Sequence, residues 1–307
     1  MTRSSNAAVL TAAFAIVVTA CSGGEVEPAA VDRAVATTAA TSVAPIRDAA
    51  ELDEVLRSVD LEVDRAVALP GVDDAAFVVV VPGDSAIDAW RSARSLVGLT
   101  GRYPVIVGGP VDYGGDIATE FEQTLQSAEY LVGDGLTVES SAADADAVDL
   151  EAWFEARAEY LVVDDSELRA STPLPDYPWA KDRFTSATDV LSEEPLPFVE
   201  IALLPTPHSW EAPAFLLWGG WNDVPSPGEL VAIFRRWSRT YGAEVVAMTG
   251  AVVEMTVPEP PATERDAIDL AREHFLVAPD NVWQGTGDLD LLAAAVLDAP
   301  VWYFWWD

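Results

Sequence analysis

Two short segments combine tryptophans with amide and carboxylate side chains, the residue types that line binding sites for polar ligands. The first segment spans residues 218–223 and the second spans residues 280–284. If the two segments converge, aromatic walls and a few polar groups form a groove suited to a sugar, a peptide or another small polar ligand. The candidate ligand-binding residues are Trp218, Trp221, Asn222, Asp223, Asp280, Asn281, Trp283 and Gln284.

The same residues also fit a purely structural role, which we favour. Tryptophans pack in protein cores, and a buried indole N–H needs a hydrogen-bond partner. Asn and Asp side chains cap turns and the first turns of helices. A structure separates the two hypotheses by showing whether the two segments meet around a cavity.

Catalysis by carboxylates is the alternative to simple binding. A hydrolase that uses Asp223 or Asp280 requires these carboxylates to converge in one pocket. No Gly-x-Ser-x-Gly segment occurs, so a serine hydrolase of the α/β type is not indicated. We therefore name no catalytic residue and favour a non-enzymatic binding or interaction module.

No motif in the sequence indicates a metal or a cofactor. His208 and His274 are the two histidines, and neither HExxH nor CxxC spacing occurs. The acidic run over residues 144–155 is similar to a calcium-binding loop, but Asp149 stands where that loop needs a glycine. We expect no metal and no cofactor, and we interpret the acidic run as solvent-exposed.

Cys21, the only cysteine, lies where bacterial lipoproteins carry their lipid. Val18-Thr19-Ala20-Cys21 matches the lipobox, and it follows Arg3 and an apolar run over residues 7–18. An ordinary cleaved secretion signal is the alternative, because small residues precede both kinds of cleavage point. We expect residues 1–20 to be a signal peptide and residues 21–45 to be a lipidated, flexible tether.

Anchoring through Cys21 predicts a location at the extracytoplasmic face of the cell membrane. The chain has 51 acidic and 17 basic residues, a formal charge of −34. Such a surface repels phosphates, so we expect no nucleic acid to bind, and the lipid rather than a basic patch should contact the membrane. The other expected partner is a protein or a small polar ligand. Arg235, Arg236 and Arg239 lie on one helix face, where pairing with the protein's own carboxylates is favoured over anion binding.

The apolar pattern of the first half predicts strands and helices in alternation. Strands are expected over residues 75–81 and 103–107, and helices over residues 49–58, 86–97, 119–131 and 148–161. A strand, a helix and a strand at this spacing favour a right-handed crossover in a mixed sheet. Residues 133–147 are expected to be a solvent loop and residues 171–198 a long surface connection.

The second half continues the same alternation, which gives an α+β fold with helices packed on a mixed β-sheet. The expected strands span residues 198–204, 214–218, 244–248, 252–257 and 301–306, and the expected helices span residues 227–240, 263–275 and 289–297. Both alternating faces of the last strand are aromatic. We therefore expect this strand in the centre of the sheet.

Four segments of the second half resemble the DUF4253 family. They are Leu203-Leu204-Pro205-Thr206-Pro207, Trp218-Gly219-Gly220-Trp221-Asn222-Asp223, Ala278-Pro279-Asp280-Asn281-Val282-Trp283-Gln284-Gly285 and Trp302-Tyr303-Phe304-Trp305-Trp306-Asp307. The family has no established function, so the resemblance implies a fold and supplies no catalytic residues. We expect residues 196–307 to form a DUF4253-like domain and residues 46–195 to form the N-terminal α/β part of the globular unit.

Overall fold

A computed structural model describes residues 43–113, 116–164 and 166–307. Cys21, the predicted signal peptide and most of the predicted tether lie outside the described residues. Ser42–Asp307 form one compact unit. Among the described helices, none has the length and apolar character that crossing a bilayer requires.

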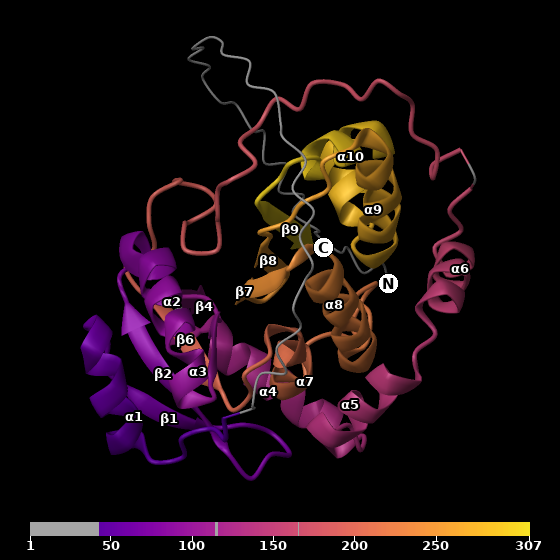
Figure 1. Ribbon diagram of the computed structural model, residues 1–307. Helices are drawn as coiled ribbons and strands as arrows, with labels where there is room; N and C mark the ends of the chain where they lie inside the picture. Colours follow the sequence, from indigo (N-terminus) through magenta and orange to yellow (C-terminus); the bar gives the residue numbers. More distant parts are fainter. Residues whose placement is uncertain (1–42, 114–115, 165) are drawn as a thin grey trace, which may run out of the picture. The chain divides into compact units, whose positions relative to one another are not determined.

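A seven-stranded mixed sheet lies at the centre of this unit (Figure 1). The strand order is β1-β2-β6-β3-β7-β8-β9, and neighbours are antiparallel except for the parallel pair β3 and β7. The strands are β1 (Arg65–Ala68), β2 (Ala75–Val81), β3 (Tyr103–Ile106), β6 (Val199–Leu204), β7 (Glu244–Met248), β8 (Val252–Thr256) and β9 (Val301–Trp305). A separate hairpin consists of β4 (Pro110–Tyr113) and β5 (Asp116–Thr119). The predicted α+β class with a mixed sheet is confirmed.

Strand β6 joins the two halves of the chain in one sheet. It lies between β2 and β3, with Ile201 opposite Val79 on one side and Ala202 opposite Val105 on the other. All of its residues are buried. Because β2 and β3 are both antiparallel to β6, they are parallel to each other, as a crossover requires. The two halves therefore share one hydrophobic core.

Side-chain caps begin several helices at positions that the sequence makes recognisable. Ser226 and Glu229 form a reciprocal capping box at the start of α8, and Thr119 and Glu122 do the same for α4. The helices are α1 (Ala49–Leu56), α2 (Ala86–Ser95), α3 (Val97–Thr100), α4 (Glu120–Gly133), α5 (Val138–Ala147), α6 (Leu150–Tyr160), α7 (Ala212–Leu216), α8 (Pro227–Tyr241), α9 (Glu264–Val277) and α10 (Leu289–Val296). In Figure 1, α9 and α10 lie side by side next to β9.

An aromatic layer joins α8 and α9 to β9. Trp237 of α8 stacks on Phe304 with ring centroids 5.2 Å apart, and His274 of α9 meets Trp302 edge-on at 4.7 Å. His274 is fully buried, and this burial lowers the pKa of its imidazole to about 3. The imidazole is therefore neutral at physiological pH and belongs to the core.

The last strand lies at the edge of the sheet, so its predicted central position is wrong. The aromatic residues on its two faces have different surroundings. Trp302 and Phe304 are buried under α8 and α9, whereas Tyr303 on the other face is 44% exposed. The mistake arose because an exposed aromatic side chain is indistinguishable from a buried one in sequence.

Residues 133–147, predicted as a solvent loop, contain helix α5. Thr137 and Ser140 begin this helix with a capping box. The helix buries the small side chains of Ser141 and Ala145, and it packs closely on α8. At Gly228 of α8 an added Cβ would lie 2.9 Å from the Cβ of Asp144, so the absence of a side chain permits this approach. The prediction failed because a helix that buries only small residues has no apolar stripe.

Residues 214–218, predicted as a strand, belong instead to helix α7 and the residues that end it. The short 3-10 turn η3 (Ser209–Glu211) precedes α7, and Pro213 occupies the first turn, where a missing N–H costs no hydrogen bond. Leu217 ends the helix in a left-handed conformation. The apolar run was too short to distinguish a strand from a buried helical turn.

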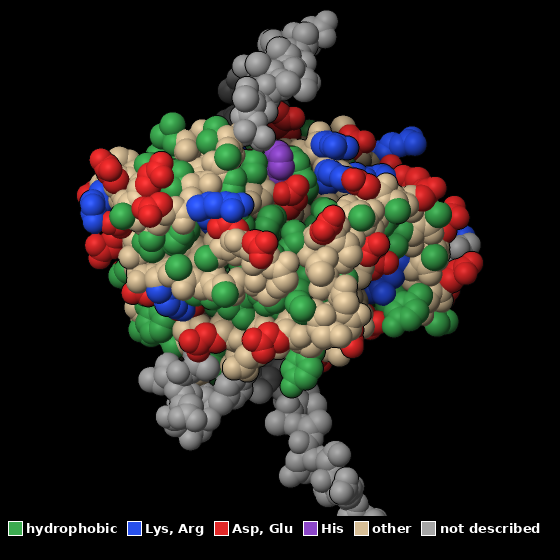
Figure 2. Space-filling view, turned by 90° about the horizontal axis from the view of Figure 1, so that it is seen from below, with side chains coloured by type: hydrophobic (Ala, Val, Ile, Leu, Met, Phe, Trp, Pro, Cys, Tyr) green, Lys and Arg blue, Asp and Glu red, His purple; other side chains and the backbone are tan. Residues whose placement is uncertain are grey.

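Acidic side chains are spread over the face of the molecule shown in Figure 2, interspersed with apolar ones and with fewer Lys and Arg side chains. This distribution agrees with the formal charge of −34. The predicted surface connection over residues 171–198 contains no helix or named strand. Glu254 of β8 holds this connection by accepting hydrogen bonds from the backbone N–H and hydroxyl groups of Thr185 and Ser186.

Candidate functional site

The segments over residues 218–223 and 280–284, whose convergence was one of two hypotheses, both contact Asp307. Asn222 Nδ2 donates to the backbone oxygen of Asp307 at 2.8 Å, and the backbone N–H of Asp307 donates to Asp280 Oδ2 at 2.9 Å. Gln284 Nε2 lies 3.0 Å from Asp280 Oδ1 and 3.3 Å from Asp307 Oδ2. We call Asn222, Asp280, Asn281 and Gln284 the C-terminal clasp.

Asn281 completes the clasp by pairing with the outer edge of β9. Its Nδ2 donates to the carbonyl of Tyr303 at 2.7 Å, and its Oδ1 accepts the N–H of Trp305 at 3.0 Å. The Asn281 side chain is buried. One amide thus supplies the donor and the acceptor that a further strand would supply, which protects an edge that otherwise invites intermolecular pairing.

The three predicted tryptophans differ in burial. Trp218 is buried and donates its indole N–H to the carbonyl of Thr249 at 2.7 Å, and Trp221 packs edge-on against it at 5.5 Å. Trp283 is 46% exposed, and its indole N–H lies 3.4 Å from Glu167 Oε1. These indole contacts agree with the hypothesis that the tryptophans have a structural role.

Asp223 contributes to this region through its backbone. Its carbonyl accepts a hydrogen bond from the Arg157 guanidinium, which also donates to the carbonyl of Leu276 at 3.0 Å. Arg157 thereby links α6 to the 218–223 segment and to the end of α9. The clasp contacts thus favour a structural role for the predicted set, and ligand binding by these residues stays a prediction.

The family comparison covers the part of the chain that holds the clasp. Residues 200–307 match the family model of DUF4253, a domain of unknown function. This chain carries a DUF4253 domain. The resemblance seen in the sequence is therefore confirmed. Neither a curated protein nor a solved structure matches the chain.

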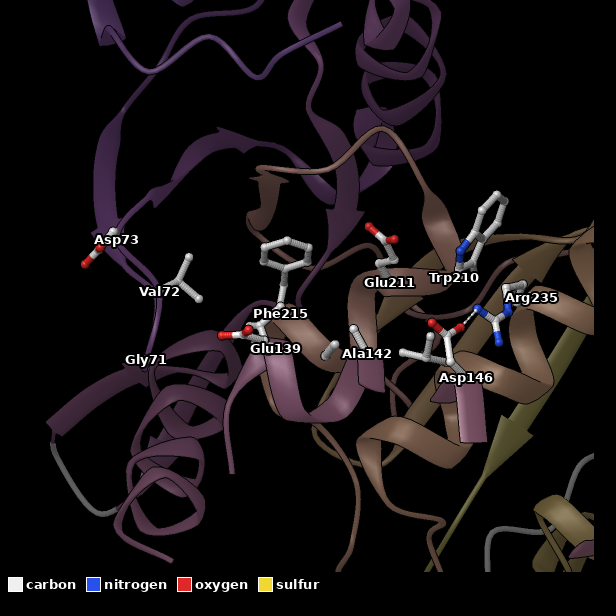
Figure 3. A pocket seen from close by; sticks show the side chains of 13 residues that line it. Gly71, Val72, Asp73, Glu139, Ala142, Asp146, Trp210, Glu211, Phe215 and Arg235 are labelled. Atoms are coloured by element: carbon white, nitrogen blue, oxygen red, sulfur yellow. Dashed lines mark hydrogen bonds and ion pairs between the residues drawn. The ribbon is translucent and has the colours of Figure 1, made fainter. Parts of the chain in front are cut away.

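A cleft of about 420 Å³ lies between the DUF4253 domain and the segments that precede it (Figure 3). Helix α5 forms one side, η3, α7 and α8 form another, and the loop after β1 closes a third. We call it the α5 cleft. Its lining residues are Gly71, Val72, Asp73, Val138, Glu139, Ala142, Asp146, Trp210, Glu211, Ala214, Phe215, Val231 and Arg235.

Aromatic and aliphatic side chains form the walls of the α5 cleft. The Trp210 indole stacks on the His208 ring with centroids 4.3 Å apart and an interplanar angle of 14°. This contact holds the indole in place. Figure 3 shows the Phe215 ring between Val72 and the Glu211 side chain. Trp210 and Phe215 are half-buried, so both retain surface for contact with a ligand.

The charged groups of the cleft divide into partnered and unpartnered ones. Arg235 donates to Asp146 Oδ1 at 2.6 Å and to the carbonyl of Ala145 at 2.9 Å. Glu211 accepts the hydroxyl hydrogen of Thr206. Among the described residues, the carboxylates of Asp73 and Glu139 accept no hydrogen bond and form no ion pair. The cleft thus has four carboxylates against a single guanidinium, and that guanidinium is already paired.

The predicted pairing of the arginine cluster with the protein's own carboxylates holds for two of its members. Arg235 pairs with Asp146, and Arg236 pairs with Glu151 at 2.6 Å and Glu273 at 2.7 Å. These contacts use the positive charge that an anionic ligand would need. Within the residues that the structure describes, no group of three or more His, Cys, Asp or Glu is placed to hold a metal ion.

A second cleft of about 600 Å³ lies at the end of β2. Its lining includes Arg57, Asp60, Glu62, Val80 and Pro82, and none of its lining residues is aromatic. The α5 cleft offers rigid aromatic walls in addition to polar groups, which is the combination that binding sites for small ligands share. We therefore take the α5 cleft as the candidate site.

The sequence did not indicate this cleft, because two of its walls differ from the predicted elements. Residues 138–147 were expected in a loop, and Ala214 and Phe215 were expected in a strand. The capping box of Thr137 and Ser140 is the local signal that identifies α5. No local signal brings the loop at Asp73 to this helix, because that contact depends on the tertiary fold.

Proposed function

We propose that this protein is a lipid-anchored binding module at the extracytoplasmic face of the cell membrane, and that its ligand occupies the α5 cleft. The observation that carries the proposal is a cleft that joins aromatic walls to carboxylates without partners. Its volume of about 420 Å³ lies within the range of roughly 300–1,000 Å³ that is typical of small-ligand sites.

The clasp supports the choice of a binding module over a hydrolase. Asp280 uses both carboxylate oxygens in hydrogen bonds, to the Asp307 N–H and to the Gln284 amide. Asp223 is held through its carbonyl by Arg157. A hydrolase would need both carboxylates free and directed at a substrate, and the contacts of the Asp280 carboxylate direct it to the sheet edge instead.

The membrane anchor rests on the sequence around Cys21. Two or more acyl chains on the processed cysteine would hold the protein stably at the bilayer, whereas one chain would be marginal. Metabolic labelling with a lipid precursor tests this part. Label should enter the wild-type protein and be lost in Cys21→Ser, and an unlabelled wild type would contradict it.

The binding part is tested by blocking the cleft. Ala142 lines the cleft from α5 and is exposed, so Ala142→Trp fills the space without entering the core. A ligand-observed NMR screen of small fragments on the lipid-free Cys21→Ser chain should give hits that Ala142→Trp abolishes. Gln284→Trp, a comparable change at the exposed clasp, serves as the control and should retain them. Hits that survive Ala142→Trp would place binding elsewhere.

A further inference from the structure

We infer that the α5 cleft is selective for small organic cations, meaning an ammonium group carried on a compact aromatic or aliphatic body. The inference rests on the proposed function and names the class of ligand for the same cleft. It follows from the charges of the cleft, from their existing partners and from the nature of the walls.

The unpartnered charges of the cleft are negative. Glu139 lies on the first turn of α5, and Asp73 lies on the facing loop after β1. Among the described residues neither carboxylate has a cation to pair with, so the cleft has negative charge available for a ligand. A cation bound in the cleft is attracted by these negative charges and displaces no existing ion pair.

The positive charge of the cleft is not available for an anion. Arg235 is fixed by Asp146 and by the carbonyl of Ala145. An anionic ligand would have to compete with Asp146 for this guanidinium and would also meet the carboxylates of Glu139 and Glu211. The cleft therefore discriminates against carboxylates and phosphates through repulsion as well as through lack of a free partner.

The walls determine the remainder of the ligand. Trp210 and Phe215 present aromatic surface, and Val72, Ala214 and Val231 add aliphatic surface. Aromatic faces attract ammonium groups through their quadrupoles and also bury apolar carbon. The preferred ligand thus combines one ammonium group with an apolar body small enough for the cleft.

The net charge of the whole chain also favours cations over anions. A formal charge of −34 creates a negative potential that draws cations toward the surface and repels anions. This long-range effect is unspecific, so any test must separate it from the local effect of Asp73 and Glu139. A control that removes two distant carboxylates makes that separation.

The test uses three probes with the same phenylethyl body and different charges: phenethylamine, 2-phenylethanol and 3-phenylpropionate. Their affinities are measured by NMR titration of the Cys21→Ser chain at low ionic strength. Phenethylamine should bind about tenfold more tightly than 2-phenylethanol, and 3-phenylpropionate should bind more weakly than both. Raising the salt concentration should reduce the advantage of the amine.

The double variant Asp73→Asn/Glu139→Gln isolates the local charges. Both substitutions are isosteric and both side chains are exposed, so folding should be preserved. The variant should lose most of the tenfold preference for the amine. The matched control Glu129→Gln/Glu159→Gln removes the same charge from exposed sites on α4 and α6 and should change amine affinity less than twofold.

The outcomes separate this inference from the proposed function. Equal binding of the amine and the alcohol, lost in Ala142→Trp, would overturn the cation preference and leave the cleft as a binding site. An unchanged amine preference in Asp73→Asn/Glu139→Gln would also overturn it. Failure of all three probes to bind would overturn it as well, and the fragment screen with Ala142→Trp then decides the proposed function independently.

Discussion

The C-terminal clasp and the α5 cleft use the same kinds of side chain in opposite ways. In the clasp, amides and a carboxylate are hydrogen-bonded to the end of β9, and the buried Asn281 takes the place of a neighbouring strand. In the cleft, Asp73 and Glu139 are exposed and have no partner among the described residues. Amide and carboxylate side chains near tryptophans therefore indicate a ligand site only where their polar atoms are not already hydrogen-bonded within the protein.

The difference follows from where each region lies in the fold. An edge strand exposes backbone donors and acceptors, so side chains that satisfy them contribute to folding. The cleft lies at the junction of α5, the β1–β2 loop and the DUF4253 domain, and none of its lining residues belongs to a strand. Changes in the clasp should therefore reduce stability, and changes in the cleft should reduce binding.

The largest effect is expected at Asn281. Asn281→Ala leaves the Tyr303 carbonyl and the Trp305 N–H without their partner, and two unsatisfied backbone groups should cost about 4 kcal/mol of unfolding free energy. Urea unfolding followed by tryptophan fluorescence measures this loss. Gln284→Ala, at the exposed rim of the clasp, should stay within about 0.5 kcal/mol. Equal, small effects at both positions would contradict the edge-closing role of Asn281.

The second largest effect is expected from His274 beneath β9, which should make the free energy of unfolding depend on pH. Burial lowers the imidazole pKa to about 3, whereas an unfolded histidine titrates near 6.5. Between these values the unfolded chain binds the extra proton, so stability is present above pH 6.5 and is lost as the pH falls. From pH 8 to pH 4.5 the wild type should lose about 2–3 kcal/mol more than His274→Phe. Parallel curves for the two proteins would show that the imidazole is not buried in its neutral form.

A smaller effect is expected at Gly228, where α5 approaches α8. In Gly228→Ala the new Cβ would lie 2.9 Å from the Asp144 Cβ and 3.0 Å from the Ser141 carbonyl oxygen, so α5 must move. We expect a loss of about 1–2 kcal/mol in urea unfolding. Because α5 forms a wall of the cleft, phenethylamine affinity should fall in the same variant. Unchanged affinity alongside reduced stability would mean that the wall is not formed by α5.

The smallest effect on stability is expected in the cleft itself. Asp73→Asn/Glu139→Gln removes two exposed carboxylates without partners among the described residues, so the unfolding free energy should change by no more than about 0.5 kcal/mol. A loss of 2 kcal/mol or more would show that these carboxylates stabilise the fold, as the clasp residues do.

The sequence predicted those elements whose signals are local. The capped, amphipathic α8 and the hairpin of β7 and β8 lie where their periodicity places them, and the buried β2 and β6 follow from uninterrupted apolar runs. Helix α5 was missed because Ser141 and Ala145 bury little apolar surface. The edge position of β9 depends on which strands pair across the fold, and its own residues do not encode that arrangement.

The candidate site could also be predicted only as far as its signals are local in the sequence. The convergence of the 218–223 and 280–284 segments was predictable from their composition as one of two hypotheses. Their attachment to Asp307 was not, because the motif that contains Asp307 does not indicate which loops contact it. The cleft combines Asp73, Glu139 and Trp210 from three separate elements, and only the tertiary structure brings such residues together.

The central claim is that ligand binds in the α5 cleft and not at the clasp, and one measurement tests it most directly. Phenethylamine is titrated into the ¹⁵N-labelled Cys21→Ser chain, and the tryptophan indole signals are followed after assignment by single Trp→Phe variants. The Trp210 indole signal and the backbone signals of Glu139 and Ala142 should move, while those of Trp221 and Trp283 stay in place. Movement of Trp221 and Trp283 with a stationary Trp210 would assign binding to the clasp and contradict the account.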